Sequence, residues 1–460
     1  MRWLILGLTV ASASCAVGST GSGPSIPAVA PIRAEMSHEQ QVDHVLNRLA
    51  YGPRPGDAER VRRVGLERWI ALQLAPEAID DRGADSVVAA YRTLSTPTSE
   101  LASISREVRM ARRDTTRAPT QMDMDARRTL QLSLAEVSVA KLARAVSSER
   151  QLHEQMVDFW ENHFSVFAGK GQTRLFIPAY DRDVIRPRAM GKFRDLLGAV
   201  AKSPAMLFYL DNAKSTSRGL NENYARELLE LHTLGVDGGY TQQDVIQVAR
   251  ALTGWSIDPR LGEFVFRPRL HDESEKTVLG HRLSPGRGME DGEQVLDILA
   301  RHPATARFIA NKLAVRFVSD SAPTALVERC AAVFGESDGD IRKTVQCVVT
   351  SPEFFSKAAY RAKIKTPFEL VASALRATNA SLDGSPRSAR IVAQLGQPIF
   401  GRQTPDGWPD RAEEWVNAGT MANRVNFGLS LAAGRVPGVR VAGVDSLQAA
   451  RITAPEFQKR

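Results

Sequence analysis

The sequence predicts a mainly α protein, a large irregular multi-helix globular unit that contains at most one small β-hairpin. Apolar residues recur at helical spacing in segments spread over nearly the whole chain. Only one segment, residues 263–267, alternates apolar and polar residues between a glycine and a proline, as a hairpin strand would. The 460 residues are 43% hydrophobic and 24% charged, a balance typical of a chain that buries a core.

The first residues are typical of a secretory signal peptide. Arg2 precedes an apolar run over residues 3–11, and small residues follow over 12–16. The run is too short to cross a bilayer as a helix, which needs about 20 apolar residues. We therefore expect a signal peptide at residues 1–16, a flexible tether at 17–36, and export to the periplasm or the extracellular medium.

The three cysteines bear on how the exported protein is held together and anchored. Cys15 occupies the place of a lipid-modified cysteine, whereas Ser12 stands where lipoprotein signals carry leucine, so a lipid anchor on Cys15 and its absence are both open. Such a lipid would be the only membrane contact. Cys330 and Cys347 fall on opposite arms of a predicted helical hairpin. An oxidising compartment favours a disulfide between them, and two buried free thiols are the alternative.

The helices can be placed by their capping and spacing signals. Ser37 and Gln40 form a capping box ahead of a helical apolar pattern, and prolines at 53 and 55 end that helix. The arginine-rich residues 105–128 are predicted to be an exposed loop with fraying helix ends. Further helices are expected at residues 57–64, 66–74, 129–146, 151–167, 193–201, 221–234, 242–252, 292–300, 305–318, 323–334, 341–349, 367–377 and 420–433.

The chain is predicted to form one main body with a C-terminal addition. Residues 379–387, rich in Ser, Gly and Asp, separate a main helical domain at 37–378 from a helical and loop segment at 379–460 packed on it. The net charge of +8 comes from 60 basic and 52 acidic residues spread along the chain. Phosphate backbones are bound by concentrated basic patches, so we expect no nucleic-acid partner.

The most informative segment for chemistry is NENYARELLELH at residues 221–232. On a helical wheel, Asn223, Glu227 and Glu230 fall in a narrow polar arc of a largely apolar helix, with Arg226 beside it. Unpaired buried charge is costly, so these acids need a partner. One alternative is a structural ion network that begins with Arg226 and Glu230. The other is a metal ion or a basic ligand held by Glu227 and Glu230.

Other polar residues could join this helix. His163 lies on an aromatic face, where a core histidine is the usual occurrence, and His271 lies in a loop, where functional residues are frequent. His271 is therefore the preferred ligand or general base. The hypothesis assigns catalysis to Glu227, Glu230 and His271, ligand binding to Asn223, Arg226, Asp211 and Asn162, and a divalent metal to Glu227, Glu230, His163, His271 and Asp272.

The function itself stays open between two classes. The sequence contains no GxSxG, HExxH, P-loop or GxGxxG motif. One hypothesis is an exported metal-dependent or hydrolytic enzyme with a buried Glu/Asn/His site. The alternative is a non-catalytic envelope protein that binds a partner protein or a polysaccharide through loops around Trp255, Trp408 and Trp415, since aromatic anchors suit such surfaces.

Several segments together carry a family resemblance. They include HVLNRLAYG at 44–52 and WENHF at 160–164, with the run at 221–235 as the most specific. The chain resembles a bacterial family described as domain of unknown function 1800, over nearly its whole length after the leader. The resemblance implies a large helical exported protein and supplies no catalytic residue. The remaining matching segments are residues 209–212, 240–241, 249–255, 271–272, 365–370 and 395–398.

Overall fold

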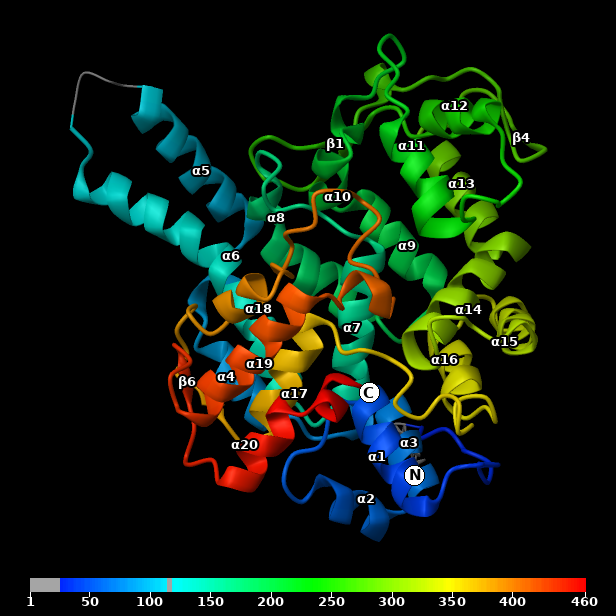
Figure 1. Cartoon of the computed structure of the whole chain (residues 1–460). Helices are drawn as coiled ribbons and strands as arrows, with labels where there is room; N and C mark the ends of the chain where they lie inside the picture. The colour runs from blue at the N-terminus through cyan, green and yellow to red at the C-terminus, as the bar shows by residue number, and fades with distance from the viewer. Residues whose placement is uncertain (1–24, 114–117) are drawn as a thin grey trace, which may run out of the picture.

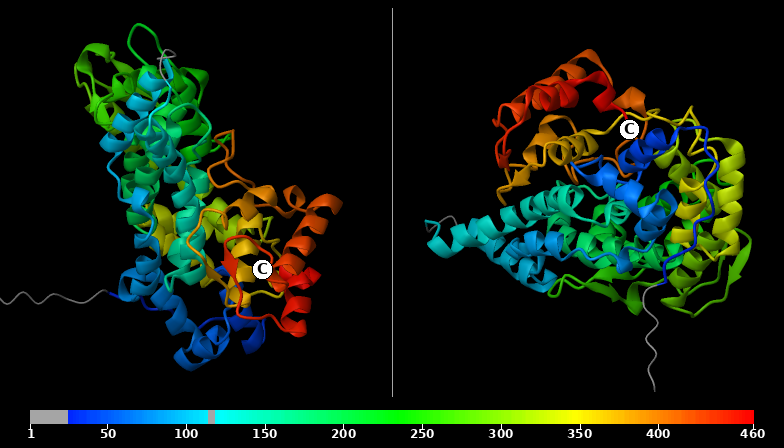
Figure 2. Two further views of the ribbon diagram at one scale, coloured as in Figure 1. Left: turned by 90° about the vertical axis from the view of Figure 1, so that its left-hand side faces the viewer. Right: turned by 90° about the horizontal axis from the view of Figure 1, so that it is seen from below.

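A computed structural model describes residues 25–113 and 118–460 (Figure 1). The predicted signal peptide, Cys15 and the first part of the predicted tether lie outside the described residues. The helical body is packed around α7 (Gln151–His163), and the C-terminal segment lies on one side of it (Figure 2). None of the described helices is long and apolar enough to cross a membrane.

The described residues are mainly α-helical, which confirms the predicted fold class. In addition to α7, the helices are α1 (His38–Arg48), α2 (Asp57–Val64), α3 (Leu66–Leu74), α4 (Arg82–Ala89), α5 (Thr98–Arg113), α6 (Gln121–Ser147), α8 (Thr173–Ala179), α9 (Phe193–Lys202), α10 (Pro204–Tyr209), α11 (Asn223–Glu227), α12 (Gln242–Ala251), α13 (Glu290–Arg301), α14 (Pro303–Phe317), α15 (Thr324–Glu336), α16 (Ile341–Val349), α17 (Pro367–Ala377), α18 (Arg390–Gln394), α19 (Ala418–Ala432) and α20 (Ser446–Thr453).

The β-structure of the described residues consists of three two-stranded antiparallel sheets, where the sequence predicted at most one hairpin. The predicted strand is β2, and it pairs with β1 so that Trp255 lies opposite Phe266. The other strands are only two or three residues long, too short for an alternating pattern to stand out in the sequence. The six strands are β1 (Trp255–Ile257), β2 (Phe264–Phe266), β3 (Lys276–Val278), β4 (His281–Leu283), β5 (Ser381–Leu382) and β6 (Val439–Arg440).

Helix boundaries coincide with the predicted ones where the signals are local. The hydroxyl of Ser37 accepts a hydrogen bond from the backbone N–H of Gln40, and the reciprocal bond completes the capping box of α1. The same box, made by Thr366 and Glu369, begins α17, with Pro367 in the first turn. Proline is tolerated there because the first helical N–H groups have no intrahelical acceptor.

The arginine-rich stretch at 105–128 differs from its prediction as an exposed loop. Most of it belongs to α5 and α6, which form an arm that projects from the body (Figure 1). Leu101 and Val108 of α5, with Leu130 and Val137 of α6, are buried in the hydrophobic core cluster. The prediction was wrong because the many polar residues concealed one apolar stripe on each helix, and the two helices pack against each other.

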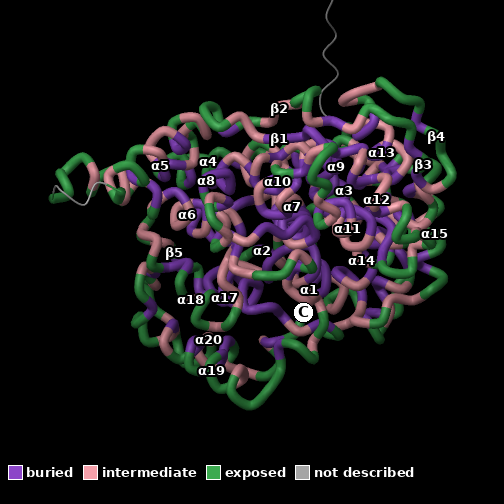
Figure 3. Tube along the Cα trace, turned by 90° about the horizontal axis from the view of Figure 1, so that it is seen from above, coloured by how far each residue is buried: buried purple, intermediate pink, exposed green. Residues whose placement is uncertain are grey.

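The described interior contains three hydrophobic clusters, of which two are large. The larger one surrounds α7, whose Leu152, Met156 and Trp160 are fully buried, and Figure 3 shows this concentration of buried backbone. The second large cluster lies where the main body meets the C-terminal segment, around Phe368 of α17 and Leu431 of α19. Leu142 of α6 belongs to this second cluster, so α6 contributes to both. The two clusters meet beside α6 and α7.

Residues 25–36, the described part of the predicted tether, lie along the body. The carbonyl of Ala28 accepts a 2.8 Å hydrogen bond from the side chain of Gln346, and the N–H of Glu35 donates to the carbonyl of Phe355. At the start of α16 the chain turns back along α15. There Cys330 and Cys347 form the predicted disulfide bond across the helical hairpin.

Candidate functional site

Helix α7 carries three buried acidic residues on one face. Glu154, Asp158 and Glu161 are four and three residues apart, so an α-helix places them one above the other. Neighbouring side chains such as Met156 and Trp160 are fully buried. A buried carboxylate is unstable without a counter-charge, so this face of α7 requires cations from other elements.

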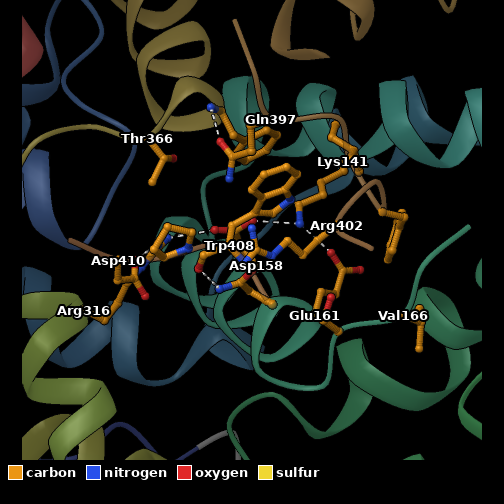
Figure 4. Close-up of a pocket in the computed structure, with 16 residues that line it drawn as sticks. Lys141, Asp158, Glu161, Val166, Arg316, Thr366, Gln397, Arg402, Trp408 and Asp410 are labelled. Atoms are coloured by element: carbon orange, nitrogen blue, oxygen red, sulfur yellow. Dashed lines mark hydrogen bonds and ion pairs between the residues drawn. The ribbon is translucent and has the colours of Figure 1, made fainter. Parts of the chain in front are cut away.

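Two basic side chains supply the counter-charges of Asp158 and Glu161. The ammonium of Lys141, on α6, lies 2.8 Å from an Asp158 oxygen and 2.6 Å from a Glu161 oxygen. The guanidinium of Arg316, on α14, lies 2.9 Å from the other Asp158 oxygen. Figure 4 shows these side chains converging from three separate helices. One lysine therefore holds both carboxylates close together.

Arg316 also joins the site to the C-terminal segment. Its guanidinium lies 2.9 Å from Asp410 and 3.1 Å from Glu369 of α17. Arg460, the last residue, lies 3.1 Å from the same Glu369 oxygen. The charges at the centre of the molecule are thus shared between the main body and the C-terminal segment.

A small cleft opens beside this ion network, at the junction of the two parts (Figure 4). Its volume is about 40 Å³, enough for a few water molecules at roughly 10–15 Å³ each. Charged and aromatic side chains surround it. They are Lys141, Asp158, Glu161, Arg316, Arg402 and Asp410, with Phe368, Phe400 and Trp408.

The two carboxylates that share Lys141 differ in proton affinity. Burial raises the pKa of Glu161 to about 8, and the neighbouring Asp181 adds to the rise, against the charge of Lys141. Burial also acts to raise the pKa of Asp158, but the charges of Lys141 and Arg316 outweigh it and hold that pKa below its usual range. At neutral pH, Glu161 therefore holds a proton while Asp158 is ionised. Such a pair can supply both an acid and a base.

Asn162, predicted to bind a ligand, lines the cleft and also holds the loop beside it. Its side-chain N–H donates to the carbonyl of Trp408, and its side-chain oxygen accepts from the N–H of Trp408, at 2.7 and 2.6 Å. Gly407 packs so closely that an added Cβ would lie 2.2 Å from the carbonyl oxygen of Asn162. The Arg402 guanidinium lies over the Trp408 ring, 5.5 Å from its centre. This loop is thereby fixed on α7.

The predicted acidic arc at 221–234 is altered by a change of helix type. Helix α11 passes into a π-helical segment at Leu228–Thr233, and the N–H of Leu234 bonds the carbonyl of Leu229, five residues back. A wheel of 100° per residue therefore misplaces every residue after 228. Glu227 and Glu230 are half-buried.

Each of these polar residues has a local contact of its own. Glu230 accepts a 3.4 Å hydrogen bond from Tyr240, and Arg226 pairs with Glu222 rather than with Glu230. Burial, followed by the charge of Glu230, raises the pKa of Glu227. The side chain of Asn223, the third residue of the predicted arc, donates to the carbonyl of Leu210. Upstream of this helix, Asp211 pairs with Lys170 and Lys214.

The predicted histidines lie in the interior. The His163 ring packs against Phe159 and Phe164, and its Nε2 lies 3.1 Å from the carbonyl of His232. The side chain of His271 is 0% exposed. Its Nε2 lies 3.3 Å from an Asp291 oxygen that also contacts Lys276 at 2.7 Å. Asp272, next in the chain, pairs with Arg250 at 2.8 Å.

The predicted metal set is not assembled. Within the described residues, no group of three or more His, Cys, Asp or Glu side chains could hold a metal ion. Glu227 and Glu230 share one helix, but His163, His271 and Asp272 have separate partners, as given above. The prediction grouped them by residue type, and the fold distributes them over different elements.

The three tryptophans of the predicted partner-binding surface differ in their exposure. Trp255 and Trp415 are buried, and only Trp408 is half-buried, beside the cleft. The sequence analysis missed Lys141, Asp158 and Glu161 entirely. Their signal was nevertheless present, because acids at 158 and 161 interrupt a helix of apolar and aromatic residues, as the acids at 227 and 230 do.

These features define a class of protein: a large, mainly α chain with a central ion network beside a small cleft. The chain belongs to the protein family of unknown function DUF1800, whose model matches residues 44–459. This confirms the family resemblance. No curated protein and no solved structure matches the chain. The cleft must therefore be interpreted from its own chemistry.

Proposed function

We propose that this protein is an exported hydrolytic enzyme in which Glu161 is the general acid and Asp158 the general base. One observation carries the proposal. Of the two carboxylates that share Lys141, Glu161 has a raised pKa and Asp158 a lowered pKa, and both line a cleft of about 40 Å³ that has room for water. Acid and base groups with separated pKa values are how one site donates and accepts protons at neutral pH.

In the proposed reaction, a water molecule in the cleft attacks the substrate. Asp158 accepts a proton from that water as its oxygen bonds to the electrophilic centre, and Glu161 gives its proton to the departing oxygen or nitrogen. Lys141 and Arg316 balance the charge that develops on the carboxylates. The reaction leaves Asp158 protonated and Glu161 ionised, and transfer of one proton from Asp158 to Glu161 after the products leave restores both groups.

The proposed location is outside the cytoplasm. The signal-like residues 1–16 support export. The bond between Cys330 and Cys347 supports it independently, because such bonds persist in oxidising compartments and are rare in the cytosol. A lipid on Cys15 remains an additional proposal, tested by mass spectrometry of the mature protein.

Chromogenic p-nitrophenyl esters, glycosides and phosphates test the activity between pH 5 and 9. We expect turnover of one class, a loss of 100-fold or more in Glu161→Gln and Asp158→Asn, and retained activity in Glu154→Gln. Glu154 is the matched control, since it is buried on the same face of α7, pairs with Arg186 and does not line the cleft.

Thermal unfolding of each variant separates lost chemistry from lost folding. Turnover that falls equally in Glu161→Gln and in Glu154→Gln would assign the network a structural role only. The absence of turnover for every substrate class would also contradict the proposal.

A further inference from the structure

We propose that a second cleft, between α5, α6 and α8, binds a phosphate or sulfate group. The cleft has a volume of about 280 Å³. It is lined by α8 and by α5 and α6, the two helices of the projecting arm in Figure 1. Arg109 and Arg112 from α5, Arg127 from α6 and Arg174 from α8 line it. None of the described residues that line it is acidic.

Arg109, Arg112 and Arg174 are exposed at the rim of this cleft and Arg127 is half-buried, and no carboxylate of the described residues pairs with any of the four. Among residues 25–113 and 118–460, Arg109 bonds only the hydroxyl of Ser105, at 3.0 Å. The half-buried Arg127 has a buried Nε with no hydrogen-bond acceptor among the described residues. A buried charged donor left without an acceptor is destabilising, so an anion in the cleft would stabilise this arrangement.

The geometry of the donors favours a tetrahedral oxyanion. Guanidinium groups bind phosphate and sulfate oxygens with paired N–H donors, which gives both strength and orientation. Gln131 and Gln172 also line the cleft and can donate to further oxygens. The four guanidinium groups come from three helices and face one cleft, and a multivalent anion between them neutralises their charge better than a single carboxylate.

The site is independent of the proposed catalytic cleft. Arg127 lies in the part of α6 that belongs to the arm, whereas Lys141 lies more than three turns further along the same helix. The 280 Å³ volume exceeds what one inorganic phosphate fills, so the expected ligand carries its phosphate or sulfate on a larger group or as pyrophosphate.

Isothermal titration calorimetry at constant ionic strength tests the proposal with inorganic phosphate, pyrophosphate, sulfate and glucose 1-phosphate. We expect at least one of the four to bind with one-to-one stoichiometry. Affinity should fall tenfold or more in Arg127→Gln and in Arg112→Gln. Arg128→Gln is the matched control, because Arg128 is exposed, adjacent on α6 and outside the cleft, and its affinity should stay within twofold of wild type.

The relative affinities identify the source of the anion, since preference for glucose 1-phosphate indicates an ester and preference for sulfate a sulfated ligand. Thermal unfolding with the same anions provides a second measurement, in which the anion raises the Tm of wild type and not that of Arg127→Gln. The proposal is overturned if no anion binds, or if Arg128→Gln weakens binding as much as Arg127→Gln, because binding would then reflect net charge alone.

Discussion

Replacing Glu161 by glutamine tests the electrostatics of the central cleft. Glutamine has the size and charge of a protonated glutamic acid, so the variant fixes the state that the fold favours. In wild type, burial raises the pKa of Glu161 from 4.5 to about 8. Each unit of pKa corresponds to about 1.4 kcal/mol between the two protonation states. The rise in the pKa of Glu161 therefore corresponds to a free-energy difference of about 5 kcal/mol between its protonated and ionised forms.

The difference in proton binding between the folded and unfolded states determines how the free energy of unfolding changes with pH. Between pH 4.5 and 8 the folded protein keeps the Glu161 proton and the unfolded chain releases it, so stability falls as the pH rises. The stabilisation is complete below pH 4.5 and is lost as the pH passes 8. Asp181 does not compensate here, because its pKa is lowered and it is ionised in both states throughout this range.

Urea unfolding of wild type and Glu161→Gln at pH 5, 6, 7 and 8 measures the effect. Subtraction of the two free energies of unfolding at each pH removes the contributions of other titrating groups. We expect the difference to change by about 1.4 kcal/mol per pH unit, with wild type losing stability relative to the variant. A difference that stays constant from pH 5 to 8 would refute the assignment of the proton to Glu161.

Three further changes have defined outcomes. Asp158→Asn leaves Lys141 and Arg316 without their shared acid and should cost about 3–5 kcal/mol in urea unfolding; a loss under 1 kcal/mol would contradict the network. Serine at both Cys330 and Cys347 should cost about 3 kcal/mol, and equal stability of oxidised wild type and variant would contradict this. Burial lowers the pKa of Lys365 to about 7, so Lys365→Met should stabilise the fold by roughly 2–4 kcal/mol at pH 6 and by less above pH 10. A gain that is independent of pH would exclude this cause.

Local signals predicted the helices well. The bounds of α2, α3 and α17 coincide with the predicted ones, because the glycines at 56 and 65 and the capping box at Thr366 act within one turn. The arm at 105–128 could not be predicted in this way. Its helices are stabilised by contact with each other, and their apolar stripes are narrow. The π-helical segment at Leu228–Thr233 likewise has no signal in a pattern of period 3.6.

The candidate site depends on contacts between distant parts of the chain. Arg316 meets an acid 158 residues earlier and another 94 residues later. A helical wheel ranks which residues share a face, but it does not identify the element that covers that face. For this reason the same argument predicted partners for buried acids at 227 and 230 and missed the stronger case at 158 and 161.

The pairing of charges explains why the C-terminal segment belongs to the site. The ionised Asp158 pairs with Lys141 and Arg316, and Arg316 in turn pairs with Glu369 and Asp410 from beyond α16. Removing one partner from a buried network leaves an uncompensated charge, which costs more than the pair contributes. The cleft is accordingly lined by residues of both large hydrophobic clusters, Phe400 of the first and Phe368 of the second. Proton affinity at Glu161 is set by the whole molecule rather than by α7 alone.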